Sequence, residues 1–389
     1  MPHSGYDARL AMAVSIPDAR LEGIAEKVAA GQRLTRQDGM LLYETPDIWR
    51  VCELANQVRR RLHGDIAYYN INRHVNYTNI CALSCKFCAF YRKRGEDGAY
   101  ELSIDDVASR ARDAAEAGAT ELHIVGGLHP WLPFSYYTDM LRAIRDTAPS
   151  LHIKAFTAVE IVHLARISKR PTEIRDVLAE LLDAGLGSLP GGGAEVFDDR
   201  VHDEAFRGKI RGRTWLDVHR TAHDLGINSN ATMLYGHVES RADRIEHLAI
   251  LREEQDRTLA EGGGCFQAII PLPFIPDGSE LSHLPGPGGL ENLRTLAICR
   301  LMLDNVPHVK AFWIMQTLPL AEHMLQCGAD DLDGTVVWYD ITKVGGDSTH
   351  QEQSVFDLRR AILDAGLQAV ERDTLYRSIE RAETASNVR

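Results

Sequence analysis

The sequence predicts an α/β protein built on a closed (β/α)8 barrel of the TIM type, with an N-terminal helical extension and a C-terminal extension. Between residues 66 and 340, short strand-like runs alternate with longer segments of helical periodicity. Continuous strand–helix alternation implies a parallel sheet, and eight such units in this length suit a closed barrel. The composition of the 389 residues, 44% hydrophobic and 25% charged, permits a sizeable core.

The elements of this barrel follow one another in a regular order. The eight expected strands are 74–80, 120–125, 151–157, 188–189, 227–235, 265–270, 309–315 and 334–339. The helices expected between them are 103–118, 134–147, 171–184, 214–225, 241–260, 290–304 and 319–327. Ser103 is a residue type that caps a helix, Gly118 is one that ends it, and Pro171 suits a first helical turn.

Two extensions flank the barrel. Residues 1–65 are expected to form an N-terminal helical extension, because their apolar residues recur at spacings of three and four. Residues 66–340 are expected to form the barrel. Residues 341–389 are expected to form a C-terminal linker, rich in glycine and polar residues, and a helix at 353–366 that packs on the barrel.

The charge of the chain disfavours nucleic acid as a partner. Asp and Glu number 55 against 43 Lys and Arg, which gives a net charge of −12, whereas binding to phosphate backbones needs a basic surface. A small anionic substrate held by a few local cations remains compatible with this charge. The first residues show no basic region followed by a long apolar run, so no signal peptide is expected, and no run of about 18 apolar residues predicts a membrane helix. We therefore expect no membrane partner and a cytoplasmic location.

Three of the seven cysteines form a motif, Cys81-x3-Cys85-x2-Cys88, directly after the first strand. Their odd number prevents all three from pairing as disulfides, but they can converge on one inorganic centre. Four-iron clusters normally take four cysteines, so three would leave one iron open for a ligand. A zinc knuckle is the alternative, but it needs a second nearby pair of ligands, and no other C-x2-C occurs. The remaining cysteines are expected to be small buried hydrophobes: Cys52, Cys265, Cys299 and Cys327.

This spacing, with Phe87 before the third cysteine, resembles the signature of the radical S-adenosylmethionine (SAM) enzymes. The resemblance implies a radical SAM barrel whose 4Fe-4S cluster is held by Cys81, Cys85 and Cys88. In that family the open iron binds the amino and carboxylate groups of SAM, and the reduced cluster cleaves SAM to a 5′-deoxyadenosyl radical. An electron donor of low potential, such as a flavodoxin or ferredoxin, is then expected as a partner.

Residues at the expected strand ends, where such barrels place their active sites, are candidates for binding SAM. They are Gly126, Gly127, Thr157, Glu160, Gly192 and Glu195. By the resemblance, the glycine pair Gly126 and Gly127 would bind the methionine amino group. A glycine run at Gly192 lets a loop pass against a flat adenine. Glu160 could anchor the ribose or equally well cap the next helix.

A further group comprises candidates for binding the substrate: Arg207, Lys209, Arg211, His237 and Gln316. The first three lie in the densest cationic stretch of an acidic chain and could hold carboxylates, although a solvated surface explains them equally well. His237 is a candidate proton shuttle, but a lone histidine is more often a hydrogen-bonded structural residue.

A closer resemblance rests on longer stretches, 76–79, 85–91, 126–130, 153–160, 190–195 and 230–239. Together they are similar to aminofutalosine synthases of the futalosine route to menaquinone. The resemblance implies addition of the 5′-deoxyadenosyl radical to 3-[(1-carboxyvinyl)oxy]benzoate, an anionic enol-ether benzoate, to give 6-amino-6-deoxyfutalosine, methionine and carbon dioxide. The sister cyclic dehypoxanthine futalosine synthase shares the cysteines and glycines and is the alternative. The stretches 154–160 and 230–235 favour the synthase.

Overall fold

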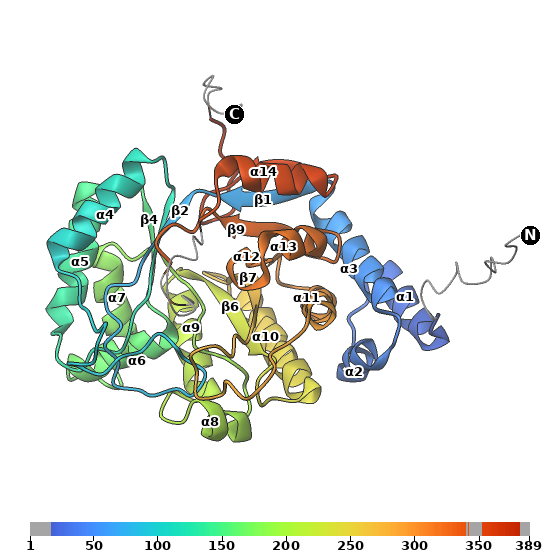
Figure 1. The fold of residues 1–389 in the computed structure, drawn as a ribbon, viewed down its shortest axis with the longest axis horizontal. Helices are drawn as coiled ribbons and strands as arrows, with labels where there is room; N and C mark the ends of the chain where they lie inside the picture. The colour runs from blue at the N-terminus through green and yellow to red at the C-terminus, as the bar shows by residue number, and fades with distance from the viewer. Residues whose placement is uncertain (1–16, 340, 342–351, 382–389) are drawn as a thin grey trace, which may run out of the picture.

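Parallel strands form the centre of the structure, a computed structural model that describes residues 17–339, 341 and 352–381 (Figure 1). Seven strands pair in chain order, every pair parallel. They are β2 (Asn72–Val75), β3 (Glu121–Ile124), β4 (His152–Ala155), β5 (Ser188–Leu189), β6 (Asn228–Tyr235), β7 (Phe266–Pro273) and β8 (His308–Val309). Parallel pairing places all their C-terminal ends at one edge.

An eighth strand, β9 (Asp331–Gly334), and the residues after it close the barrel. The amide of Ala311 donates to the carbonyl of Asp331 at 2.8 Å, which joins the segment after β8 to β9. The amide of His74 on β2 donates to the carbonyl of Val337 at 2.8 Å. The segment 331–337 therefore lies between β8 and β2, and the predicted fold class is confirmed.

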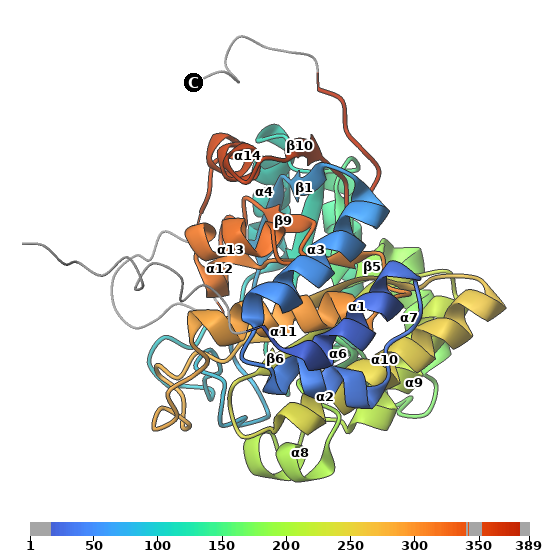
Figure 2. The same ribbon diagram turned by 90° about the vertical axis from the view of Figure 1, so that its right-hand side faces the viewer.

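Helices cover the outside of this barrel (Figures 1 and 2). They are α4 (Ile104–Glu116), α5 (Phe134–Thr147), α6 (Ala158–Ile167), α7 (Ile174–Ala184), α8 (Asp199–Ala205), α9 (Gly212–Asp224), α10 (Arg241–Glu261), α11 (Gly289–Met302), α12 (Trp313–Gln316) and α13 (Leu318–Leu325). Side chains alternate along a strand, so β3 places Leu122 and Ile124 in the apolar core and Glu121 and His123 on the barrel interior.

The N-terminal segment is helical, with η2 (Ala19–Leu21), α1 (Glu22–Ala29), α2 (Arg36–Glu44) and α3 (Ile48–His63). Helix α3 packs along α11, and α2 packs against α10 and α11 (Figure 2). Helix α3 buries Val51, Leu54, Ala55 and Val58, which recur at helical spacing on one face. The predicted helical character of this segment is confirmed.

A second sheet was not predicted. It has the order β10–β1–β9, with both pairs parallel, and uses β1 (Ile66–Asn70) and β10 (Gln368–Glu371). It joins the start of the barrel to the segment after α14 (Val355–Asp364), a helix that was predicted. The linker expected before α14 and the residues beyond 381 lie outside the described residues. The boundaries at residues 65 and 340 stay a prediction.

Four expectations about single elements were wrong. The strand expected at 334–339 lies earlier, at β9 (Asp331–Gly334). The strand expected at 309–315 ends at Val309, and the apolar run after it turns into α12, because short apolar runs suit either element. Helices α6 and α8 were not expected. Across the described residues, every helix is too short or too polar to span a membrane.

Candidate functional site

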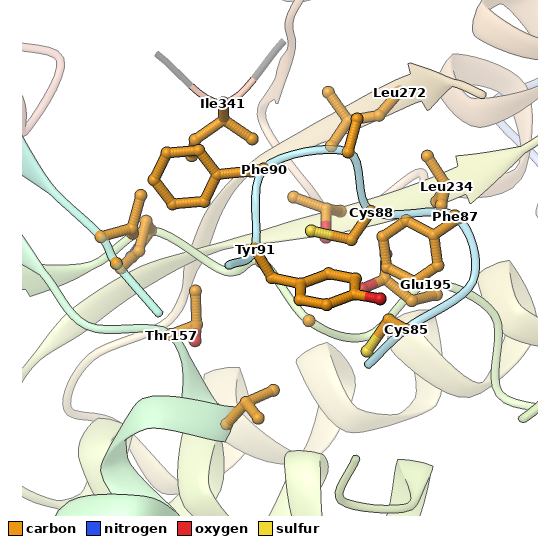
Figure 3. A pocket seen from close by; sticks show the side chains of 18 of the residues that line it. Cys85, Phe87, Cys88, Phe90, Tyr91, Thr157, Glu195, Leu234, Leu272 and Ile341 are labelled. Atoms are coloured by element: carbon orange, nitrogen blue, oxygen red, sulfur yellow. The ribbon is translucent and has the colours of Figure 1, made fainter. Parts of the chain in front are cut away.

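A cavity of about 330 Å³ opens at the C-terminal ends of the barrel strands. The loop after β2 brings the three motif cysteines to this cavity, and β6 and β7 add apolar side chains such as Leu234 and Leu272 (Figure 3). Barrels of this kind place their active sites at this end of the sheet. The cavity is therefore the candidate active site.

All three cysteines, Cys81, Cys85 and Cys88, line the cavity. The amides of Leu83 and Leu128 each donate to the Sγ atom of Cys81 at 3.4 Å. Burial raises the pKa of the Cys85 thiol to about 12 and also raises the pKa of Cys88. Without a metal these thiols would stay protonated, because a charged thiolate is costly in an apolar site.

The donor set fits an iron–sulfur cluster with one open position. Three sulfur atoms face one cavity, and amide hydrogen bonds to a ligand sulfur are a usual feature of such clusters. A cationic metal centre would also stabilise the thiolates that burial disfavours. The four other cysteines do not line the cavity, so the described residues offer no fourth cysteine.

The side chain of Lys93 holds the cysteine loop in place through two hydrogen bonds. Its Nζ atom donates to the carbonyl of Cys81 at 2.9 Å and to that of Leu83 at 2.8 Å. The lysine therefore fixes the backbone that orients the first thiol.

The glycine pair after β3 lines the cavity and touches the cysteine loop. A Cβ atom on Gly127 would lie 2.4 Å from the carbonyl oxygen of Ile80, the residue before Cys81. A Cβ atom on Gly126 would lie 2.7 Å from the ring of Tyr77. These glycines therefore let two strand ends approach closely, in addition to any contact with a ligand. Their predicted binding of SAM stays a prediction.

Glu160 has both carboxylate oxygens engaged. Oε1 accepts from the hydroxyl of Tyr77 at 2.8 Å and from the amide of Gly126 at 3.0 Å. Oε2 accepts from the amide and the hydroxyl of Thr157, at 2.7 and 2.8 Å, in a capping box at the start of α6. Burial raises the pKa of Glu160. Thr157 and Glu160 both line the cavity, but this geometry favours the capping role of Glu160 that the sequence left open.

The loop after β5 brings Glu195 and Lys209 together. Their side chains form an ion pair, and both are nearly buried. Burial alone would lower the pKa of Lys209. The negative charge of Glu195 is the main opposing influence, and the pKa is raised overall, so the ammonium stays charged. The ammonium also lies 5.1 Å from the ring centroid of Phe87. Gly192 lines the cavity as well, and its carbonyl accepts from the indole of Trp215 at 3.1 Å.

Four residues predicted to bind the substrate do not line this cavity, and their binding role stays a prediction: Arg207, Arg211, His237 and Gln316. Arg207 is exposed, and Arg211 pairs at the surface with carboxylates of α8, an unpredicted helix. The ring of His237 contacts the carbonyl of Leu234 at 3.1 Å, as a structural histidine does. The amide of Gln316 donates to the hydroxyl of Tyr235 at 3.3 Å.

Several cavity residues were missed by sequence reasoning. They are His74, His123, Tyr91, Asp277, Asp333 and Tyr339. His74 and His123 lie on adjacent strands in matching register, and the alternation of side chains places both inside the barrel. This alternation of side chains along the strands could have indicated from the sequence that both histidines lie inside the barrel.

Comparison with known proteins places this site in a family. Residues 75–251 match the Radical SAM superfamily, and residues 263–385 match the CofH/MqnC C-terminal region. The chain is 45% identical to the aminodeoxyfutalosine synthase of Thermus thermophilus, over 94% of this chain and 97% of that protein. The chain belongs to the aminodeoxyfutalosine synthase family. The Streptomyces coelicolor aminodeoxyfutalosine synthase is 43% identical over 92% of this chain and 94% of that protein.

Wider relatives of the aminodeoxyfutalosine synthase family share the fold. A 5-amino-6-(D-ribitylamino)uracil--L-tyrosine 4-hydroxyphenyl transferase from Archaeoglobus fulgidus is 37% identical over 84% of this chain and 93% of that protein. Among solved structures, methylornithine synthase superposes with a TM-score of 0.70 at 16% identity, over 89% of this chain and 97% of that chain. At this identity the second likeness concerns the fold alone.

Proposed function

We propose that this chain is a radical SAM aminodeoxyfutalosine synthase that acts on 3-[(1-carboxyvinyl)oxy]benzoate in menaquinone biosynthesis. The observation that carries this is 45% identity to such a synthase over nearly the full length of both proteins. Three motif cysteines at one cavity support it. In the proposed reaction one electron breaks the C5′–S bond of SAM, C5′ bonds to the vinyl carbon, and rearrangement releases carbon dioxide. The electron is given up again after the rearrangement, so the reaction is redox-neutral overall. The products are 6-amino-6-deoxyfutalosine and methionine.

The cofactors of the proposed reaction are a 4Fe-4S cluster and SAM. Cys81, Cys85 and Cys88 would hold the cluster, which supplies the electron that cleaves SAM. We propose a low-potential donor of the flavodoxin or ferredoxin class as its source. Gly126 and Gly127 are the proposed contacts to the methionine part of SAM.

The chain's own residues serve this reaction by position and by exclusion of water. Leu234, Leu272 and Phe274 provide apolar walls that keep competing hydrogen donors away from a reactive carbon. Lys209 places a positive charge at the cavity, and its ion pair with Glu195 compensates that charge. Glu195 keeps that charge in place.

The deciding experiment is anaerobic incubation of the reconstituted protein with SAM, dithionite and the enol-ether benzoate, followed by mass spectrometry. We expect one adenosylated product per methionine. Stoichiometric release of free 5′-deoxyadenosine during productive turnover of a nucleoside-like substrate would instead favour the sister cyclase. Cys85→Ala should lose SAM cleavage and iron while keeping the unfolding midpoint. Full turnover by that variant would contradict the assignment.

A further inference from the structure

Two histidines form the inner end of the cavity, below the level of the cysteines. His123 lies three residues before Gly126, and a strand rises about 3.3 Å per residue, so the histidine lies about 10 Å deeper in the barrel. His74 on β2 is its register partner. The two rings stack, with centroids 4.5 Å apart and planes inclined by 17°. The cavity thus has an upper level near the cysteines and a lower level at the histidines.

The two rings lack hydrogen-bond partners in the described part of the chain. Both nitrogens of His74 are buried and unpartnered, and His74 is 1% exposed. No described group hydrogen-bonds to the ring of His123, which is partly exposed to the cavity. Buried polar groups in proteins are nearly always hydrogen-bonded, and an exception calls for an explanation. A ligand at the lower level of the cavity would supply the missing partner.

The charges around the pair cancel. Three cations and three carboxylates lie around it in contacting pairs: Lys154 with Glu121 at 2.6 Å, Lys310 with Asp333 at 3.0 Å, and Arg372 with Asp331 at 2.8 Å. Burial lowers the pKa of His74 to about 4 and lowers the pKa of His123 well below its ordinary value. Both rings are therefore neutral near pH 7, and each keeps one N–H donor.

Aromatic side chains also line the cavity near the two histidines. The ring of Tyr339 meets His74 edge-on, with centroids 5.1 Å apart and planes at 90°. Phe312 in turn packs edge-on against Tyr339, at 5.7 Å. Aromatic rings favour such edge-to-face neighbours. A benzene ring at this level would meet aromatic walls and one neutral N–H donor.

We infer that His123 binds an oxygen of the aromatic acid substrate, and that His74 positions the His123 ring by stacking against it. The inference rests on the proposed function, since the aromatic acid is the substrate proposed there. A carboxylate is the preferred acceptor, because hydrogen bonds to a charged oxygen are shorter and stronger than those to a neutral one. SAM would occupy the upper level, next to the cysteines and the glycine pair.

The test uses the anaerobically reconstituted holoenzyme. Without reductant, calorimetry measures the binding of the enol-ether benzoate and of SAM separately. We expect His123→Phe to weaken binding of the benzoate and to raise its KM at least tenfold. SAM affinity and substrate-free SAM cleavage should stay within twofold of wild type. His123→Gln, which restores an N–H donor, should recover part of the loss.

Two further variants separate binding from packing. His152→Gln is the matched control, because His152 lies on the next strand outside the cavity and already contacts Ser188 at 2.9 Å. It should leave benzoate binding unchanged. His74→Phe keeps a ring behind His123 and removes two unpartnered nitrogens, so it should raise the thermal midpoint and change KM less than threefold.

The outcomes distinguish this inference from the proposed function. If wild type makes the adenosylated product but His123→Phe and His123→Gln bind the benzoate like wild type, the inference is overturned and the function stands. If wild type binds the benzoate through His123 but makes no such product, the proposed reaction is overturned and the binding role stands. Failure of wild type to bind the benzoate overturns both.

Discussion

Gly127→Ala tests how closely the strand after β3 approaches the cysteine loop. A Cβ atom at this position would lie 2.4 Å from the carbonyl oxygen of Ile80 and 2.8 Å from its carbonyl carbon. Both atoms belong to backbone, which cannot rotate away as a side chain does. The loop must therefore move by more than half an ångström, and Cys81, the next residue, moves with it. We expect a loss of about 1–3 kcal/mol in the free energy of unfolding, the usual cost of overpacking.

The measurement has two parts. Guanidinium unfolding gives the stability, and iron and sulfide content after anaerobic reconstitution reports whether the three cysteines still converge. We expect iron uptake to fall below half of the wild-type value. Gly23→Ala is the control, since a Cβ atom there meets nothing within 4 Å and helix α1 should gain about 0.5–1 kcal/mol. A Gly127→Ala protein with wild-type stability and iron content would refute the close approach.

Two further predictions concern buried charge. Lys209→Met leaves the Glu195 carboxylate buried without its partner and should cost about 3–5 kcal/mol of unfolding free energy, whereas the double variant with Glu195→Gln should recover most of it. A double-mutant cycle by denaturant unfolding measures this, and equal loss in the single and double variants would contradict it. Burial raises the pKa of Asp330, but His308 and Arg300 outweigh burial and hold it below the ordinary value. A lowered carboxyl pKa stabilises the fold above the unfolded-state value of about 3.9, and this stability is lost as the pH falls through the folded-state pKa. Wild type should therefore lose stability on acidification below about pH 4, and Asp330→Asn, although less stable throughout, should show a shallower loss. Parallel unfolding curves from pH 7 to 3 would count against this role of Asp330.

The barrel was predictable because its signal is local and repeated. Short strand-like segments alternate with helical segments along the chain, so an error at one boundary does not change the number of strands predicted. The second sheet was not predictable in this way. Strands β1 and β10 have five and four residues and pair across almost the whole sequence. Nothing local in either segment specifies the other.

The parts of the candidate site that depend on the spacing of residues along the chain could be predicted. The parts that depend on the direction in which a side chain points could not. The three cysteines lie within a span of eight residues, so any compact loop brings them together. The direction in which the arginines of the cationic stretch point could not be predicted. Arg211 pairs with Asp199 and Asp203 on α8, a short helix that was not predicted. The side of a loop on which a side chain lies depends on neighbours that spacing does not reveal.

The charge balance of the cavity bears on how an anion is recognised there. Among the described lining residues four are carboxylic acids, Glu160, Glu195, Asp277 and Asp333, and the one lysine or arginine is Lys209. That lysine is already paired with Glu195. The cationic stretch Arg207–Arg211 had suggested that salt bridges hold the substrate. The lining of this cavity instead offers a dianionic acid no set of free cations. The carboxylates of such an acid must be met by neutral donors, which discriminate by position more than by charge. An uncharged His123 at the inner end of the cavity is a donor of that kind, and it favours a substrate whose acidic group lies on the far side of a flat ring.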